Sequence, residues 1–157
     1  MDMKLELVPV PVTDVDRAKA FYADMVGFVV DVDVWPSEGM RFVQLTPPGS
    51  ACSIVIGTGL KDVSDMTPGS QRGLHLVVND IETARGKLIG RGVAVGEVQD
   101  VGGGVKYAWF ADPDGNSMAL QEMGWRTGDN FLREFPGYFD LGRVVAGLGW
   151  WWVGFRL

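Results

Sequence analysis

The side chains of this chain that are best suited to chemistry are a few polar and aromatic residues. The candidates for a binding site are His75, Gln121, Tyr107, Trp109 and Arg41, and His75 is the only histidine. An imidazole, an amide, a phenol and a guanidinium can hydrogen-bond to polar groups, while the aromatic rings offer faces for stacking. Such a set is typical of a site for a flat, partly polar organic molecule.

Other chemistries are less well supported by the sequence. Nothing near Cys52 would lower the pKa of its thiol, so we interpret it as a small buried residue. Ser53 lacks an orienting acid that would make it a nucleophile with His75. One histidine with Gln121 provides too few ligands for tight metal binding. We therefore interpret His75 as a structural or ligand-binding residue, with a displaced metal site as the alternative.

The candidate residues lie in predicted strands, in which alternate side chains share a face. His75 falls in a strand over 73–79, and Gln121 falls in a strand over 117–122 on the same face as Ala119. In two more strands, the corresponding faces carry Arg41, Val43 and Leu45 over 40–46, and Tyr107, Trp109 and Ala111 over 105–111. We assign these faces to a cleft. The alternative is that Trp109 and Val43 fill a core, because a single bulge reverses the alternation.

These strands belong to a sequence that repeats itself. The turn Asp-Pro-Asp-Gly-Asn at 112–116 recurs in a degraded form at 46–50, at an offset of 66 residues. The stretch that begins at Val12 corresponds to the one that begins at Val78 at the same offset. Because a repeat of this length is one supersecondary unit, we interpret the chain as an internal duplication.

Each repeat has the order βαβββ. The first, over 4–57, is predicted to have strands over 4–12, 28–34, 40–46 and 52–57 and a helix over 15–25. The second, over 73–122, is predicted to have strands over 73–79, 92–98, 105–111 and 117–122 and a helix over 81–90. Residues 57–72 are expected to be a linker, and Pro9 and Pro11 restrict the first strand to a sheet edge. We predict an α+β fold in which two curved mixed sheets enclose a cleft.

The composition restricts the function classes and the location. A net charge of −6 over 157 residues argues against binding to nucleic acid or to anionic membranes. The single cysteine indicates a reducing compartment. No apolar run is long enough to span a membrane, and no signal peptide is visible. We therefore expect a cytoplasmic protein that neither enters a membrane nor binds nucleic acid.

At this point the chain resembles the vicinal oxygen chelate superfamily, which includes glyoxalase I, extradiol dioxygenases, fosfomycin resistance enzymes and bleomycin resistance proteins. The matching stretches are 12–22, Gly27-Phe28, 73–80 and 110–122. The resemblance implies the paired βαβββ fold. It leaves the function open, because such a fold hosts isomerases, dioxygenases, transferases and non-catalytic drug binders. It also implies a homodimer, since members of the superfamily are often dimers.

The resemblance also implies where a divalent metal would be held in catalytic members. The corresponding positions here are Leu7, Gly73, Ala119 and Ser53. The first three offer no donor atom in a side chain, and a serine hydroxyl is a poor neutral ligand. We therefore expect no metal and no other cofactor, with a divalent metal as the alternative.

A glycine-rich aromatic tail over 123–157 follows the repeats and contains four of the six tryptophans. Short helices over 130–134 and 140–146 are predicted in it, and we expect the tail to pack on the domain or on a partner subunit. For the domain over 1–122 we retain two hypotheses. The first is metal-independent binding of a small aromatic or amphipathic molecule. The alternative is a glyoxalase-type lyase or isomerase, or a dioxygenase-like enzyme, that uses His75.

Overall fold

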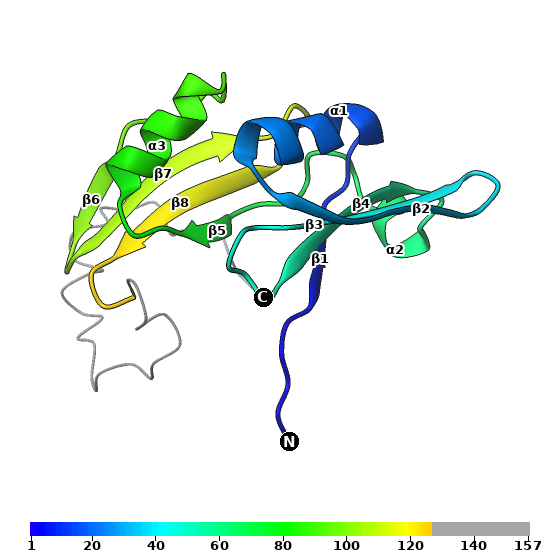
Figure 1. Cartoon of the computed structure of the whole chain (residues 1–157), viewed down its shortest axis with the longest axis horizontal. Coiled ribbons are helices and arrows are strands. Elements are labelled where there is room, and N and C mark those ends of the chain that lie inside the picture. Colours follow the sequence, from blue (N-terminus) through cyan, green and yellow to red (C-terminus); the bar gives the residue numbers. More distant parts are fainter. Residues whose placement is uncertain (127–157) are drawn as a thin grey trace.

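Two modules of the same order make up the part of the chain that the structure describes. The computed structural model describes residues 1–126 and contains two four-stranded sheets, each with a helix on one face (Figure 1). The first module consists of β1 (Leu7–Pro9), α1 (Val15–Ala20), the π-helix η1 (Phe21–Val26), β2 (Val29–Ser37), β3 (Met40–Thr46) and β4 (Ser53–Thr58). The second consists of β5 (Leu74–Val77), α3 (Ile81–Gly90), β6 (Gln99–Gly102), β7 (Val105–Ala111) and β8 (Ser117–Met123).

The two sheets have equivalent topologies, which confirms the predicted duplication. Their strand orders are β1-β4-β3-β2 and β5-β8-β7-β6. The first strand of each module pairs in parallel with the last, and the other neighbours are antiparallel. The predicted α+β class is therefore correct. The proline-bearing β1 lies at an edge of its sheet, as predicted, because Pro9 cannot donate to a second neighbour.

Aspartates begin both main helices. Asp14 Oδ1 accepts from the backbone N–H of Arg17 at 3.0 Å, and Asp80 Oδ1 accepts from that of Thr83 at 2.9 Å. These bonds satisfy N–H groups that a helix leaves unpaired at its start. Gly27, with φ of +96°, ends η1 in the left-handed region that favours glycine.

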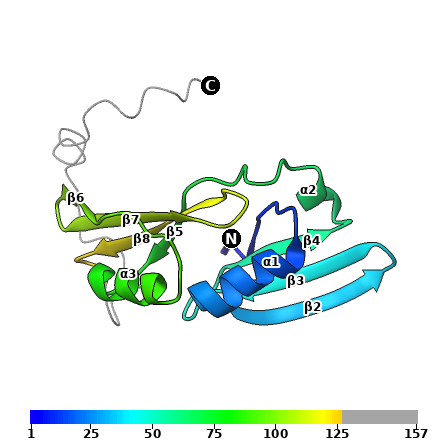
Figure 2. The same cartoon turned by 90° about the horizontal axis from the view of Figure 1, so that it is seen from above.

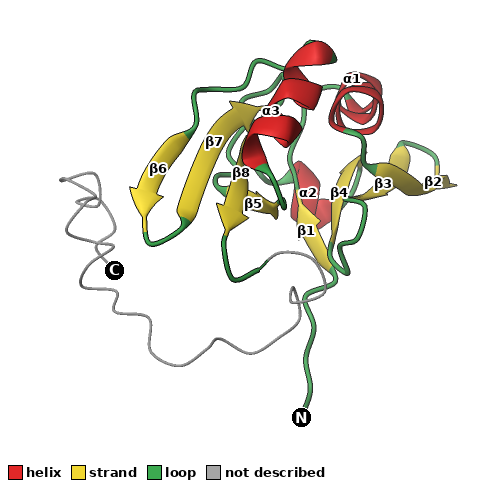
Figure 3. Cartoon of the chain, turned by 60° about the vertical axis from the view of Figure 1, so that its left-hand side comes forward, coloured by secondary structure: helices red, strands yellow, loops and turns green. Residues whose placement is uncertain are grey.

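Both helices cover the same side of the molecule. Figure 1 shows α1 above the first sheet and α3 above the second, and Figures 2 and 3 show the same two helices from above and from the side. Apolar side chains between each helix and its sheet form the core, and the fully buried ones include Val10, Ala18, Tyr22, Val43, Leu45, Ile56, Ile81 and Ala108. Within residues 1–126, the opposite face of each sheet is covered by neither α1 nor α3, and we call these two surfaces the open faces.

Three predicted elements differ from the structure. β1 is shorter than the strand predicted over 4–12. β6 begins only at Gln99, so the strand predicted over 92–98 is wrong. Val93, Val95 and Val98 in that stretch pack against the core, so their alternation reflects packing rather than a sheet ladder. The linker contains a short helix, α2 (Lys61–Ser64). The helices predicted over 130–134 and 140–146 lie outside the described residues.

The turn between β7 and β8 joins the second module to the first. Tyr22 Oη of η1 donates to Asp112 Oδ2 at 2.8 Å, and burial, followed by the charge of this carboxylate, raises the pKa of the phenol. Asn116 Nδ2 donates to the backbone oxygen of Pro11 at 2.9 Å, and Arg17 forms an ion pair with Asp114 at 2.8 Å. Three residues of the Asp-Pro-Asp-Gly-Asn turn thus bind the first module.

Candidate functional site

The open face of the second module gathers four of the five candidate residues. His75 on β5 and Trp109 on β7 are both register partners of Ala119 on β8, which lies between them. In the next row, Tyr107 on β7 is the register partner of Gln121 on β8. Because register partners share a face, the alternation predicted for this module is confirmed.

A chain of hydrogen bonds joins three of these side chains. His75 Nδ1 lies 3.0 Å from Gln121 Oε1, and Gln121 Nε2 donates to Tyr107 Oη at 2.9 Å. With the amide in this orientation, its oxygen accepts from Nδ1–H of the imidazole. The imidazole Nε2 is then an acceptor, and the phenolic proton of Tyr107 is available to another molecule.

Three rings pack beside this chain. The His75 ring meets Tyr107 and Trp109 edge-on, with centroids 5.5 and 5.7 Å apart, and the two larger rings stack at 6.2 Å with an interplanar angle of 25°. Ala119 is fully buried beneath them. Trp109 keeps 40% of its surface exposed, although such a ring gains free energy on burial. The alternative that Trp109 fills the core is therefore wrong. It is correct for Val43, which is fully buried in the core together with Leu45, so these two residues do not line the predicted cleft.

The assignment of Arg41 to this face is wrong. The side chain lies on the helix side of the first sheet, where Nε and Nη2 donate to the two carboxylate oxygens of Asp33 at 2.9 and 3.0 Å. Nη1 also donates to Asp16 Oδ1 on α1 at 2.7 Å, and Lys19 forms an ion pair with Asp33 at 2.7 Å. Arg41 therefore connects α1 to β2 and β3, and each of its three nitrogens donates to a carboxylate.

A difference in hairpin length explains this error. Gln44 pairs with Val55 in the first module, and Tyr107 pairs with Gln121 in the second. Register partners in the first hairpin are all separated by odd numbers of residues, whereas those in the second are all separated by even numbers. The two hairpins therefore differ by an odd number of residues, so residues of β3 that match β7 at the offset of 66 point to the opposite face.

The open face of the first module carries a different polar group. Gln44 Nε2 donates to Ser53 Oγ at 3.0 Å, and Thr46 Oγ1 lies 2.6 Å from the same hydroxyl. Thr46 also donates to Asp31. The Ser53 hydroxyl is therefore held by neighbouring side chains and has no histidine partner among residues 1–126, which does not favour a nucleophilic role.

The metal positions implied by the resemblance do not fit a divalent ion. Leu7 is the register partner of Ser53 in the first sheet, and Ala119 is that of His75 in the second. Leucine and alanine, like Gly73 just before β5, have no side-chain donor. No group of three or more His, Cys, Asp or Glu side chains within residues 1–126 could hold a metal.

The single cysteine is not positioned for thiolate chemistry. Cys52 is half-buried just before β4, and burial, with a further contribution from Glu6, raises the pKa of its thiol. A raised pKa keeps the sulfur protonated at neutral pH, which makes it a poor nucleophile.

Several known proteins are similar to this chain in fold and in sequence. The family model described as Glyoxalase/Bleomycin resistance protein/Dioxygenase superfamily matches residues 4–120. The antibiotic binding protein TnmS3 from Streptomyces sp. CB03234 is 34% identical with a TM-score of 0.68, and the alignment covers 78% of this chain and 98% of that protein. No curated protein matches.

Two more solved structures are similar. A glyoxalase/bleomycin resistance protein, also from Streptomyces sp. CB03234, is 36% identical with a TM-score of 0.63, over 74% of this chain and 98% of its own. A member of the same superfamily from Sphaerobacter thermophilus DSM 20745 is 30% identical with a TM-score of 0.68. The alignment covers 77% of this chain and 98% of that protein. This chain therefore belongs to the glyoxalase/bleomycin resistance protein/dioxygenase superfamily.

Proposed function

We propose that the protein binds a small aromatic or amphipathic molecule on the open face of the second module, without a metal. The observation that carries the proposal is the exposed, stacked pair of Tyr107 and Trp109 beside the hydrogen-bonded His75 and Gln121. Exposed aromatic faces next to a few fixed polar groups are typical of small-molecule sites. The similarity to TnmS3, an antibiotic binding protein, supports a ligand of antibiotic type.

The hydrogen-bond chain defines the polar groups that such a ligand would carry. His75 Nε2 accepts and the Tyr107 hydroxyl donates when the Gln121 amide has the orientation seen here. Rotating the amide by 180° reverses both roles, so that the imidazole donates and the phenol accepts. In either state the face offers one donor and one acceptor. A ligand with a hydroxyl and a carbonyl on a flat ring system would complement it.

An enzymatic role has weaker support. A catalytic imidazole is usually oriented by a carboxylate, but His75 Nδ1 contacts the neutral amide of Gln121. The side chains on the open faces also do not form a set of ligands that could hold a catalytic metal in place of such a carboxylate. We therefore place the glyoxalase-type or dioxygenase-like reaction second.

The test is ligand binding by a Trp109→Ala variant. Antibiotics with planar aromatic rings are screened by thermal shift, and the tightest binder is titrated calorimetrically into the metal-free protein. We expect Trp109→Ala to weaken binding more than about tenfold, because the stacking surface is lost. Trp35→Ala is the matched control, since Trp35 is an exposed tryptophan of the first module. Equal affinities of wild type and Trp109→Ala would remove the assignment of the site.

The assembly and location of the protein also remain proposals. We propose a homodimer, because both β1 and β5 are edge strands and the family resemblance implies dimers. A cytoplasmic location is consistent with the single cysteine. Within residues 1–126, no helix is long and apolar enough to cross a membrane. The net charge of −6 argues against nucleic acid as a partner.

A further inference from the structure

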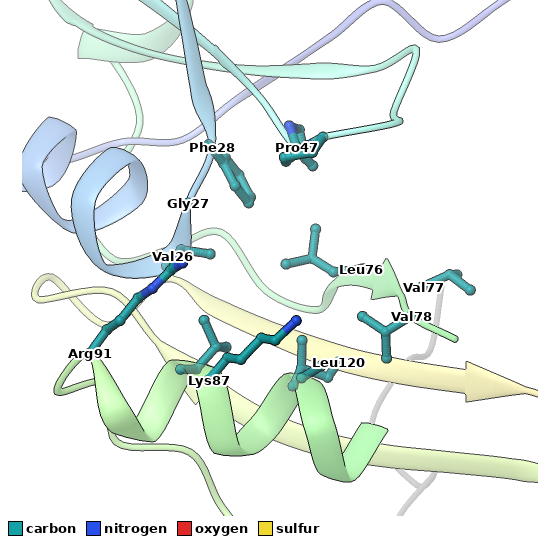
Figure 4. A pocket seen from close by; sticks show the side chains of 13 residues that line it. Val26, Gly27, Phe28, Pro47, Leu76, Val77, Val78, Lys87, Arg91 and Leu120 are labelled. Atoms are coloured by element: carbon teal, nitrogen blue, oxygen red, sulfur yellow. The ribbon is translucent and has the colours of Figure 1, made fainter. Parts of the chain in front are cut away.

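A cavity of about 340 Å³ lies between the two modules, on a different side from the open faces. It is bordered by the end of η1, the turn after β3, strand β5 and helix α3 (Figure 4). Its apolar lining includes Phe28, Pro47, Leu76 and Leu120. None of the four side chains of the proposed open-face site lines it. The volume is within the range of small-molecule sites.

Two cations border this apolar space. Lys87 and Arg91 are one helical turn apart at the end of α3, so they lie on the same face of the helix. Figure 4 shows Lys87 extending toward β5 and Arg91 reaching toward Val26 and Gly27. The absence of a side chain at Gly27 makes room for Arg91, since a Cβ there would lie 2.8 Å from Nη1.

Within residues 1–126, no acidic side chain pairs with either of these two cations. Neither Lys87 nor Arg91 has a hydrogen bond or ion pair from its side chain to any of residues 1–126, whereas Arg17, Lys19, Arg41, Arg85 and Lys106 all form ion pairs. The chain has 20 acidic and 14 basic residues, yet none of the acidic residues within 1–126 lines the cavity. Cations at the end of a helix are favoured by its dipole, but the dipole does not explain an apolar cavity beneath them.

We propose that this cavity is a second binding site, which takes an amphipathic organic anion. The apolar part of the molecule would lie against Phe28, Leu76 and Leu120. A carboxylate would pair with the guanidinium of Arg91 and the ammonium of Lys87, because a charged group at an apolar surface is stabilised by partners of opposite charge. The proposal is independent of the open-face site and of any metal.

The test is calorimetric titration of the full chain with decanoate, below its micellar concentration, and with decyltrimethylammonium, which has the same chain and the opposite charge. We expect decanoate to bind with a stoichiometry of one and the cation not to bind. In Lys87→Gln/Arg91→Gln the affinity should fall at least about tenfold. The control Lys4→Gln/Lys61→Gln removes two exposed charges that do not line the cavity, and it should keep the wild-type affinity.

Two more variants separate the cavity from other sites. Ala84 lines the cavity on α3, so Ala84→Phe would fill the space and should also abolish binding in a protein that remains folded by circular dichroism. Trp109→Ala should leave decanoate affinity unchanged. The proposal is overturned if decanoate shows no saturable binding. It is also overturned if either the Lys87→Gln/Arg91→Gln variant or the folded Ala84→Phe variant binds decanoate with the wild-type affinity. Loss of binding in Trp109→Ala would place the anion on the open face and also overturn it.

Discussion

Asp33 is the residue that determines the role of Arg41. It accepts from two nitrogens of Arg41 and one of Lys19, and its side chain is only 16% exposed. Hydrogen bonds from Arg41, followed by those from Lys19, lower the pKa of the Asp33 carboxyl to about 2. Asp33 holds Arg41 on the helix side of the first sheet, away from the open faces, which is why we exclude it from the site.

The same carboxylate predicts a dependence of stability on pH. The pKa of Asp33 is lower in the folded chain than the value of about 3.9 expected when unfolded, so its contribution is present above about pH 5 and is lost as the pH falls toward 2. The free energy of unfolding of wild type, relative to Asp33→Asn, should fall by roughly 2 kcal/mol between pH 5 and pH 2. Urea denaturation at several pH values measures this difference.

The matched control for this prediction is Asp24→Asn. Asp24 lies on the exposed side of η1 and forms no ion pair with any of residues 1–126, so its removal should leave the pH profile like that of wild type. A constant difference between wild type and Asp33→Asn from pH 5 to pH 2 would show that Asp33 does not stabilise the fold through its charge.

Among the elements, the turn of residues 112–116 has two roles. It connects β7 to β8, and it also binds the first module through Tyr22, Pro11 and Arg17. The buried Asp112 accepts from Tyr22 and also from the backbone N–H groups of Asp114 and Asn116. The turn thus stabilises both its own hairpin and the contact between modules.

Replacing Tyr22 by Phe tests this contact. The change removes one hydrogen bond to a buried carboxylate, and we expect it to lower the free energy of unfolding by about 1.5–3 kcal/mol. Urea denaturation at pH 7 is the measurement. Tyr107→Phe is the control, because the Tyr107 hydroxyl lies on an open face where water can replace the lost bond, so it should cost less than about 1 kcal/mol. Equal losses for the two variants would contradict the role of the turn.

The elements also show how far the sequence could predict the site. Alternation placed His75, Tyr107, Trp109 and Gln121 on one face correctly, because β5, β7 and β8 pair without a break in register. It failed for Arg41, because the change in hairpin length that reverses β3 has no local signal in the strand itself. The register that reveals it depends on pairing between strands, which is a tertiary property.

At the scale of the whole molecule, the duplication produces two open faces with unequal chemistry. The first carries Gln44, Thr46 and Ser53, which bind one another, and the second carries exposed rings. The paired βαβββ order could be predicted from the repeat. The cavity between the modules could not, because Phe28, Leu76 and Lys87 are brought together only by the contact of one module with the other.

The central claim is that the open face of the second module binds an organic molecule without a metal. The most direct test is the metal content of the purified, tag-free protein by mass spectrometry, before and after incubation with nickel, manganese, iron and zinc. We expect less than stoichiometric metal in every case, in wild type and in His75→Ala alike, because the positions at 7, 73 and 119 have no donor atoms. One divalent ion per chain that is lost in His75→Ala would contradict the account and favour the enzyme.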